Sequence, residues 1–506
     1  MNIFVQQVQQ NLTCFLPESA LVVTFCLAIL AGLIFRKTPK VVAWLVFIGV
    51  GAALFFAVKQ VGVSQEIFSG MIAVDPFAVF FKSLAAVCTL TIFLFSIFSS
   101  EVQTTVKRMA EYYSLLIAMT LGMFLMAGAT NVLITNVLMM VLAMELTSLS
   151  SYILAGYTKE AADSSEASLK YIIYGAVSSG VMLYGISILF GFTGAMDYAG
   201  INHSLTLNAP NYFALLTATI FIVVGFGYKI SAVPFHFWTP DVYEGAPITI
   251  TAFLSVASKA AGFAMMIRFF KVIFIDTTIL AVPAGMWTSL YGFEWNKLLA
   301  ILSVLTMTLG NLVAVWQDNL KRLLAYSSIA HAGYMLMGVV VLSDQGIAAV
   351  LIYFMMYLFM NLGAFFVVML VANKTGSEDI SVYRGLGYRV PLIGVAMAIF
   401  LVSLTGLPPT AGFIGKLYLF AALLDAKWIW LAVVGALNSV ISLYYYARVL
   451  RYMFLRDPEG QTSSITLQRS EAILLLVFVI PTLLFGLYFG PLVELANASV
   501  QMFGIR

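Results

Sequence analysis

The sequence predicts an all-α polytopic membrane protein, and two observations lead to this fold class. Of the 506 residues, 62% are hydrophobic and only 10% are charged, so the chain lacks the polar residues that would cover a soluble domain of this size. Apolar runs of roughly 20 residues recur from end to end, and a helix of that length crosses a hydrocarbon core about 30 Å thick. We therefore expect about fourteen transmembrane helices in a lipid bilayer.

The apolar runs set the positions of these helices. The expected spans are, in chain order, 19–35, 41–58, 74–98, 111–129, 131–156, 168–191, 211–238, 248–274, 294–316, 322–342, 346–372, 390–424, 428–455 and 471–492. The further apolar segment 277–293 is short and contains Pro283 and two glycines. We expect it to be re-entrant or interfacial rather than another span.

The basic residues predict the orientation, because cytoplasmic loops are enriched in lysine and arginine. With the N-terminus outside, the inner loops hold basic residues such as Lys107, Arg108, Lys321, Arg322, Arg384, Arg389 and Arg451. The outer loops hold only a few, among them Lys59, Lys297 and Lys427. An even number of spans with both termini on the outer side fits this distribution.

Two of the expected spans are interrupted. The seventh contains Pro234, and the twelfth contains Gly406, Pro408 and Pro409, all residues that break a helix. Such breaks are tolerated in a membrane where they face protein or water, and they are typical of transport paths. Their separation by five spans predicts two inverted five-helix repeats. The expected organisation is a three-helix segment 1–110, repeats 111–275 and 276–456, and a C-terminal helix in 457–506.

Several kinds of function lack their sequence motifs. Cys14, Cys26 and Cys88 lie far apart and form no C-x-x-C pair, so no iron-sulfur cluster or structural zinc is expected. The chain has no phosphate-binding loop, no dinucleotide fingerprint and no H-E-x-x-H motif. The net charge of +3 is dispersed, which argues against nucleic acid as a partner. We expect no cofactor or metal in this chain.

A small set of ionisable residues lies inside the expected spans, where each costs at least about 2.5–3.5 kcal/mol unless it is paired or functional. Glu145 and Lys259 lie deep within the fifth and eighth spans. Lys229 precedes the seventh-span break, and Lys416 follows the twelfth-span break. His331 lies within the tenth span and has an intrinsic pKa suited to proton transfer. Together these residues predict a proton relay.

Structural explanations compete with this hypothesis. Glu145 and the three lysines could form static buried ion pairs that hold helices together. His331 could simply form a hydrogen bond between helices. His236, near the cytoplasmic end of the seventh span, could either function or cap the broken helix, and Lys170 could belong to a solvated first turn.

Three stretches carry a family resemblance: KISAVPFHFWTPDVYEGAPITITAFLSVASK (229–259), LKRLLAYSSIAHAGYM (320–335) and GLPPTAGFIGK (406–416). They resemble the signatures of the antiporter-like subunits of proton-pumping NADH:quinone oxidoreductase, respiratory complex I. The resemblance covers nearly the whole chain, and the DVYEGAP wording is most similar to the N-type subunits. The M type has glutamate where this sequence has Lys416, and the L type has a long lateral helix beyond the fourteenth span. This sequence shows neither feature, which again favours the N type.

The resemblance implies roles for individual residues. Glu145 resembles the glutamate that pairs with the seventh-helix lysine, here Lys229. Lys259 resembles the central lysine of the eighth helix, Lys416 that of the broken twelfth helix, and His331 a position in the central polar axis. It also implies a bacterial cytoplasmic membrane, neighbouring membrane-arm subunits as partners, and NADH, FMN, iron-sulfur clusters and quinone in partner subunits. Two rival functions are a subunit of a multisubunit Na⁺/H⁺ antiporter and a scaffold that does not transport.

Overall fold

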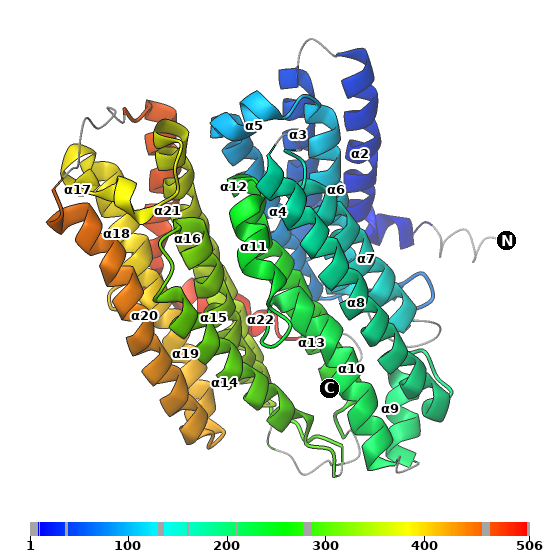
Figure 1. The fold of residues 1–506 in the computed structure, drawn as a ribbon. Coiled ribbons are helices and arrows are strands. Elements are labelled where there is room, and N and C mark those ends of the chain that lie inside the picture. Colours follow the sequence, from blue (N-terminus) through cyan, green and yellow to red (C-terminus); the bar gives the residue numbers. More distant parts are fainter. Residues whose placement is uncertain are drawn as a thin grey trace.

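The chain is almost entirely helical wherever its structure is described (Figure 1). The computed structural model describes residues 9, 11–35, 39–129, 136–158, 161–207, 211–276, 279, 283, 285–290, 292–457 and 466–502. The longer helices are α2 (Leu16–Ile34), α3 (Pro39–Val58), α4 (Pro76–Phe98), α6 (Met109–Gly128), α7 (Asn136–Ala155), α8 (Ala162–Thr193), α10 (Tyr212–Ile230), α13 (Lys259–Ile273), α14 (Trp295–Ala314), α15 (Leu320–Val340), α16 (Asp344–Thr375), α18 (Pro391–Thr405), α19 (Ala411–Asp425), α20 (Ile429–Leu455) and α21 (Arg469–Leu487).

Short elements connect or extend these helices. They are α5 (Ser100–Thr105), α9 (Tyr198–Leu207), α11 (Trp238–Gly245), α12 (Ile248–Phe253), the π-helix η1 (Leu254–Ser258), the 3₁₀ helix η2 (Ile380–Tyr383), α17 (Leu386–Arg389) and α22 (Gly490–Ala498). The antiparallel strands β1 (Gln65–Ile67) and β2 (Ile72–Val74) form a small hairpin between α3 and α4. The sequence analysis did not predict this hairpin, because each of its two strands is only three residues long.

The predicted fold class is confirmed. In the described ranges, thirteen helices are long and apolar enough to cross a membrane. The remaining expected span, 390–424, is formed by α18 and α19 in succession, each 15 residues long. The described residues of 277–293 form no helix, and two isolated bridges tie them to their surroundings, Ile275 with Ser289 and Met286 with Ser343.

Burial separates a central group of helices from a peripheral one. The most apolar window of Ile248–Ile273 is 100% buried and those of α15 and α16 are 94% buried, against 33% in α2 and 28% in α3. Figure 1 shows the early helices (blue to green) on one side of the molecule and the later ones (yellow-green to orange) on the other. A helix that is apolar on all sides belongs in the interior, as α13, α15 and α16 do.

Candidate functional site

The seventh span breaks directly after Lys229. α10 ends at Ile230, and Ser231 takes a left-handed conformation with φ of 62°. The backbone groups released by the break bond to protein. The Thr306 hydroxyl accepts a hydrogen bond from the Val233 N–H at 3.0 Å, and the Trp238 indole donates to the Tyr228 carbonyl at 3.1 Å. The break is therefore stable inside the bundle, as the membrane environment requires.

Lys229 is buried, with 2% of the residue exposed. Its ammonium donates a hydrogen bond to the Ser148 hydroxyl at 3.2 Å. Glu145 lies one turn before Ser148 on α7 and is within electrostatic range of Lys229, but the Glu145–Lys229 ion pair expected from the resemblance is not formed. The Glu145 Oε1 atom is buried without a hydrogen-bond partner in the described part of the chain. Ser148 thus holds the lysine one helical turn away from the carboxylate.

Lys259 follows the π-helix η1, a helix irregularity often found at functional sites. The residue is 1% exposed, and its ammonium donates to the Ser328 hydroxyl at 2.8 Å. The same ammonium lies 5.9 Å from the centre of the Tyr243 ring. Three residues further along α13, Gly262 packs against the stem of Lys229, because a Cβ there would lie 3.1 Å from the Lys229 Cγ. The Lys229 stem therefore packs against α13, the helix that carries Lys259.

One face of α15 carries the polar groups that follow Lys259. Ser327, His331 and Tyr334 are spaced i, i+4 and i+7, so they share a face, and Ser328 lies beside them. The two His331 ring nitrogens contact hydroxyl groups, Nδ1 that of Tyr353 at 2.7 Å and Nε2 that of Tyr446 at 3.3 Å. The Tyr446 hydroxyl also contacts that of Ser327.

Lys416 lies beside the second break. α18 ends at Thr405, and Gly406 takes a left-handed conformation with φ of 89°. The Lys416 ammonium donates to the Thr405 carbonyl, which the break has released, at 2.8 Å and to the Ser439 hydroxyl at 3.0 Å. It also lies 4.4 Å from the centre of the Tyr334 ring. Lys416 is thus held by the broken helix and by the end of the α15 polar face.

These residues form one buried row, which we call the lysine row: Lys229, Lys259, His331 and Lys416. His331 is within electrostatic range of both Lys259 and Lys416. The three ammonium groups donate to neutral oxygens, and no carboxylate among the described residues forms an ion pair with any of them. A hydroxyl both donates and accepts hydrogen bonds, so it can pass a proton between neighbours. The arrangement suits proton transfer through a dry interior.

His236 and Lys170 lie outside this row. His236 is 4% exposed, and its Nδ1 has no hydrogen-bond partner within the described ranges. α11 begins after Phe237 without a side-chain cap, and the His236 ring is within range of both the Pro234 backbone carbonyl at the break and the Lys259 ammonium. The Lys170 side chain is 38% exposed and forms ion pairs with Glu166 at 2.8 Å and Asp241 at 2.6 Å.

Sequence reasoning missed the neutral partners of the row. Serine and tyrosine are ordinary residues of membrane helices, and nothing in the sequence marks Ser148, Ser328, Ser439 or Tyr446 as special. The i, i+4, i+7 spacing of Ser327, His331 and Tyr334 was the one available signal. In the described part of the chain, no group of three or more His, Cys, Asp or Glu residues could hold a metal ion.

Comparison with known proteins agrees with this fold. Residues 134–442 match the family model described as NADH:quinone oxidoreductase/Mrp antiporter, TM. The chain is 49% identical over 500 residues to NADH-quinone oxidoreductase subunit N 2 of Chloroherpeton thalassium, covering 97% of this chain and 95% of the relative. It is 44% identical to subunit N of Chlorobium chlorochromatii, covering 97% and 95% of the two chains.

Solved structures show the same architecture. A chain of respiratory complex I from Thermus thermophilus with bound aureothin is 30% identical and superimposes with a TM-score of 0.78, covering 95% of this chain and 99% of that chain. A chain of the Mrp complex from Dietzia sp. is 21% identical, with a TM-score of 0.80 and 97% of both chains covered, and shares the fold.

The broken helices and the buried lysine row place this chain in the class of integral membrane proteins that have a line of ionisable side chains inside the helix bundle. Within that class, the chain belongs to the NADH:quinone oxidoreductase/Mrp antiporter transmembrane family.

Proposed function

We propose that this chain is the proton-translocating N subunit of a bacterial NADH:quinone oxidoreductase, and that protons move along the lysine row. One observation carries the proposal: Lys229, Lys259 and Lys416 are buried, and each ammonium bonds to neutral oxygens. Such a lysine can release its proton without leaving a carboxylate unpaired. Relatives that are 49% and 44% identical over almost the whole chain carry the name subunit N, which supports the choice of complex.

Glu145 is the proposed gate of the row. Burial disfavours a charged ammonium, whereas a nearby carboxylate favours it. Ser148 now separates Glu145 from Lys229, so a rotation or shift of α7 that replaces the hydroxyl with the carboxylate would change the hold of Lys229 on its proton. Moving one charge against 100 mV needs about 2.3 kcal/mol, and two charges 4 Å apart interact by about 4 kcal/mol at an effective dielectric constant of 20. The electrostatic interaction between Glu145 and Lys229 would therefore be large enough to drive a proton against the membrane potential.

The subunit would work without redox groups of its own. NADH oxidation and quinone reduction, with their FMN and iron-sulfur clusters, would take place in partner subunits of the complex. Other membrane-arm subunits would be the immediate neighbours, and the cytoplasmic membrane the location, with both termini on the outer side. The two five-helix repeats, 111–275 and 276–456, would each supply one broken helix and one lysine beside it.

The direct test is proton translocation by the assembled complex in proteoliposomes. Lys229→Ala and Glu145→Gln are each expected to abolish or strongly reduce the number of protons moved per electron. Ser150→Ala is the matched control, because Ser150 lies on α7 with Glu145 and its hydroxyl bonds only to the Leu146 carbonyl in the described structure. A wild-type yield of protons from both variants would reject the proposed roles.

A subunit of a Na⁺/H⁺ antiporter is the rival candidate, because the Mrp complex has the same fold, but the relatives named subunit N do not favour it. It predicts sodium-dependent antiport in vesicles that contain no NADH dehydrogenase. The subunit N proposal predicts no such antiport, and co-purification with a hydrophilic arm that contains flavin and iron-sulfur clusters.

A further inference from the structure

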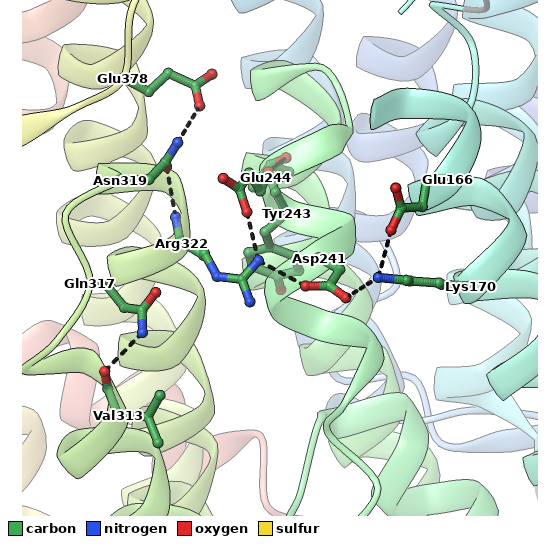
Figure 2. Close-up of polar contacts among 11 residues, drawn as sticks. Glu166, Lys170, Asp241, Tyr243, Glu244, Val313, Gln317, Asn319, Arg322 and Glu378 are labelled. Carbon is green, nitrogen blue, oxygen red and sulfur yellow. Dashed lines mark hydrogen bonds and ion pairs between the residues drawn. The ribbon is translucent and has the colours of Figure 1, made fainter. Parts of the chain in front are cut away.

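A second group of charged residues lies near the lysine row and is not part of it. We call it the Asp241 cluster: Lys170, Asp241, Glu244 and Arg322 (Figure 2). Asp241 uses both carboxylate oxygens, accepting from Lys170 at 2.6 Å through Oδ2 and from Arg322 at 2.8 Å through Oδ1. Arg322 also pairs with Glu244 at 2.6 Å. The two positive and two negative charges cancel.

The cluster joins three helices that are far apart in the sequence. Lys170 is on α8, Asp241 and Glu244 are on α11, and Arg322 is on α15. A second link lies beside it, where the Lys321 ammonium donates to the Ala246 carbonyl at 2.9 Å. The short helix α11, which follows the broken seventh span, is therefore tied on one side to α8 and on the other side to α15. Figure 2 shows Asp241 between the two basic residues.

The same two helices, α11 and α15, carry the groups that surround Lys259. Tyr243 follows Asp241 by two residues, and its ring faces the Lys259 ammonium. Ser328 follows Arg322 by six residues, about 9 Å along α15, and accepts the Lys259 hydrogen bond. The distance between Asp241 and Arg322 therefore sets how α11 and α15 present Tyr243 and Ser328 to the lysine.

Packing around α11 adds a second constraint from α8. Tyr171, the residue after Lys170, stacks on Trp238 of α11 with ring centres 4.4 Å apart and planes 13° apart. The Tyr171 carbonyl also accepts a hydrogen bond from the Tyr228 hydroxyl at 3.1 Å. The apolar contact fixes the start of α11 against α8, whereas the ion pairs of Asp241 fix its rotation and its link to α15.

The charge state of Asp241 suits a permanent link. Burial acts to raise the pKa of the Asp241 carboxyl, but the hydrogen bonds from Lys170 and Arg322 outweigh it and hold that pKa below its ordinary value. The Asp241 carboxylate is therefore charged throughout the neutral pH range.

We propose that Asp241 is a positioning residue of the proton relay: by binding Lys170 and Arg322 together, it holds α11 against α8 and α15 so that Tyr243 and Ser328 stay in place at Lys259. This role rests on the proposed function, because it acts through Lys259. A residue that only stabilised the fold would change the amount of assembled complex, whereas a positioning residue changes the protons moved per electron in the complex that has assembled.

The test compares Asp241→Asn with Asp241→Glu in the assembled complex in proteoliposomes. Asp241→Asn is expected to lower the number of protons moved per electron by about threefold or more. Asp241→Glu keeps the charge, so it is expected to retain most of the wild-type number of protons per electron. Glu166→Gln is the matched control, because Glu166 pairs with Lys170 from an exposed position and, among the described residues, forms no ion pair with Arg322. A wild-type yield from assembled Asp241→Asn would overturn the inference.

Two further variants keep the result decisive. If Asp241→Asn does not assemble, Lys170→Met is measured in its place, because it removes only one of the two ion pairs of Asp241 and leaves the pair with Arg322. A wild-type yield from Lys170→Met overturns the inference. Lys259→Ala, measured in parallel, separates the two proposals. Normal pumping by Lys259→Ala contradicts the proposed function, whereas loss in Lys259→Ala with normal pumping by Asp241→Asn contradicts only the role of Asp241.

Discussion

Two of the sets of buried charges among the described residues differ in their partners. In the first set, Lys82 pairs with Glu18 at 2.6 Å and Arg268 of α13 pairs with Asp75 at 2.8 Å, and all four side chains are at most 1% exposed. In the lysine row the basic groups are just as buried, but they bond to hydroxyl and carbonyl oxygens. Burial is therefore common to both sets, and the partner distinguishes them: we propose that a carboxylate partner fixes the charge of a buried lysine, whereas a neutral partner lets the charge change.

A single helix contains both kinds of charge. α13 carries Lys259 at its start and Arg268 nine residues later, about 13.5 Å away. Asp75 binds the Arg268 guanidinium through both oxygens and also accepts a hydrogen bond from the Ala78 N–H at the start of α4. Arginine stays protonated in proteins, so this end of α13 is a fixed anchor for the helix that carries Lys259.

The largest effect is expected when a lysine of the lysine row is given a carboxylate partner. Ser328→Asp places a carboxylate where the Lys259 ammonium now meets a hydroxyl, which turns the contact into a buried ion pair like Lys82–Glu18. We expect proton translocation by the assembled complex to fall at least roughly tenfold, the equivalent of about 1.4 kcal/mol. Ser328→Asn, a neutral change at the same position, should retain far more. Equal pumping by both variants would remove the distinction between fixed and mobile charges.

The next largest effect concerns stability in the N-terminal region. Glu18→Ala leaves Lys82 buried without its carboxylate, which should lower the free energy of unfolding by about 3–5 kcal/mol. The double variant Glu18→Leu with Lys82→Met removes both charges and should be close to neutral or stabilising. Thermal unfolding of the purified complex measures both. A double variant as unstable as the single one would show that the pair does more than hold helices.

A smaller effect is expected at the second break. Gly406 has φ of 89°, and a Cβ there would lie 2.7 Å from the Lys416 Cδ, whereas Gly376, with φ of 67°, has nothing within 4 Å of that position. Alanine at either site should cost roughly 1–2 kcal/mol of backbone strain. Only Gly406→Ala should also lower pumping, because it displaces Lys416. Equal pumping by the two variants would mean that the exact place of the ammonium is unimportant.

The smallest effect depends on pH and involves Glu66 in the hairpin near Arg268. Burial raises the pKa of the Glu66 carboxyl from 4.5 to about 7, against a smaller lowering by Arg268. A raised pKa means that the contribution to stability is complete below about pH 4.5 and is lost as the pH rises through about 7. The Glu66→Gln variant has no ionisable group at this position, so it cannot lose this contribution to stability. Its melting temperature relative to that of the wild type should therefore rise between pH 5 and pH 8. A difference independent of pH would contradict the assignment.

The positions of the helices could be predicted from the sequence because the bilayer imposes a length. All fourteen expected spans correspond to helices, with boundaries such as 322–342 against Leu320–Val340. Pro234 and Gly406 also located both breaks, since the chemistry of proline and glycine acts locally. The β1–β2 hairpin could not be predicted, because two strands of three residues leave no periodic pattern.

The burial of the ionisable residues of the lysine row could be predicted as well, because an ionisable residue stands out in an apolar run. Their partners could not. α13 and α16 are buried on almost every side, so no polar stripe shows which face meets which neighbour. The Ser148 contact of Lys229 depends on the relative rotation of α7 and α10, and the Ser328 contact of Lys259 depends on that of α13 and α15. Rotation of apolar helices is a property of packing, and it is not encoded in any single segment.

The central claim is that lysines with neutral partners move protons and ion-paired lysines do not. Protons translocated per electron, measured in proteoliposomes of the assembled complex, test it in one experiment with Lys259→Met and with the double variant Glu18→Leu, Lys82→Met. Each protein loses a buried ammonium, but only Lys259 lies in the lysine row. The account predicts loss of translocation in Lys259→Met and the wild-type value in the double variant. The wild-type value in Lys259→Met, or equal loss in both, would contradict it.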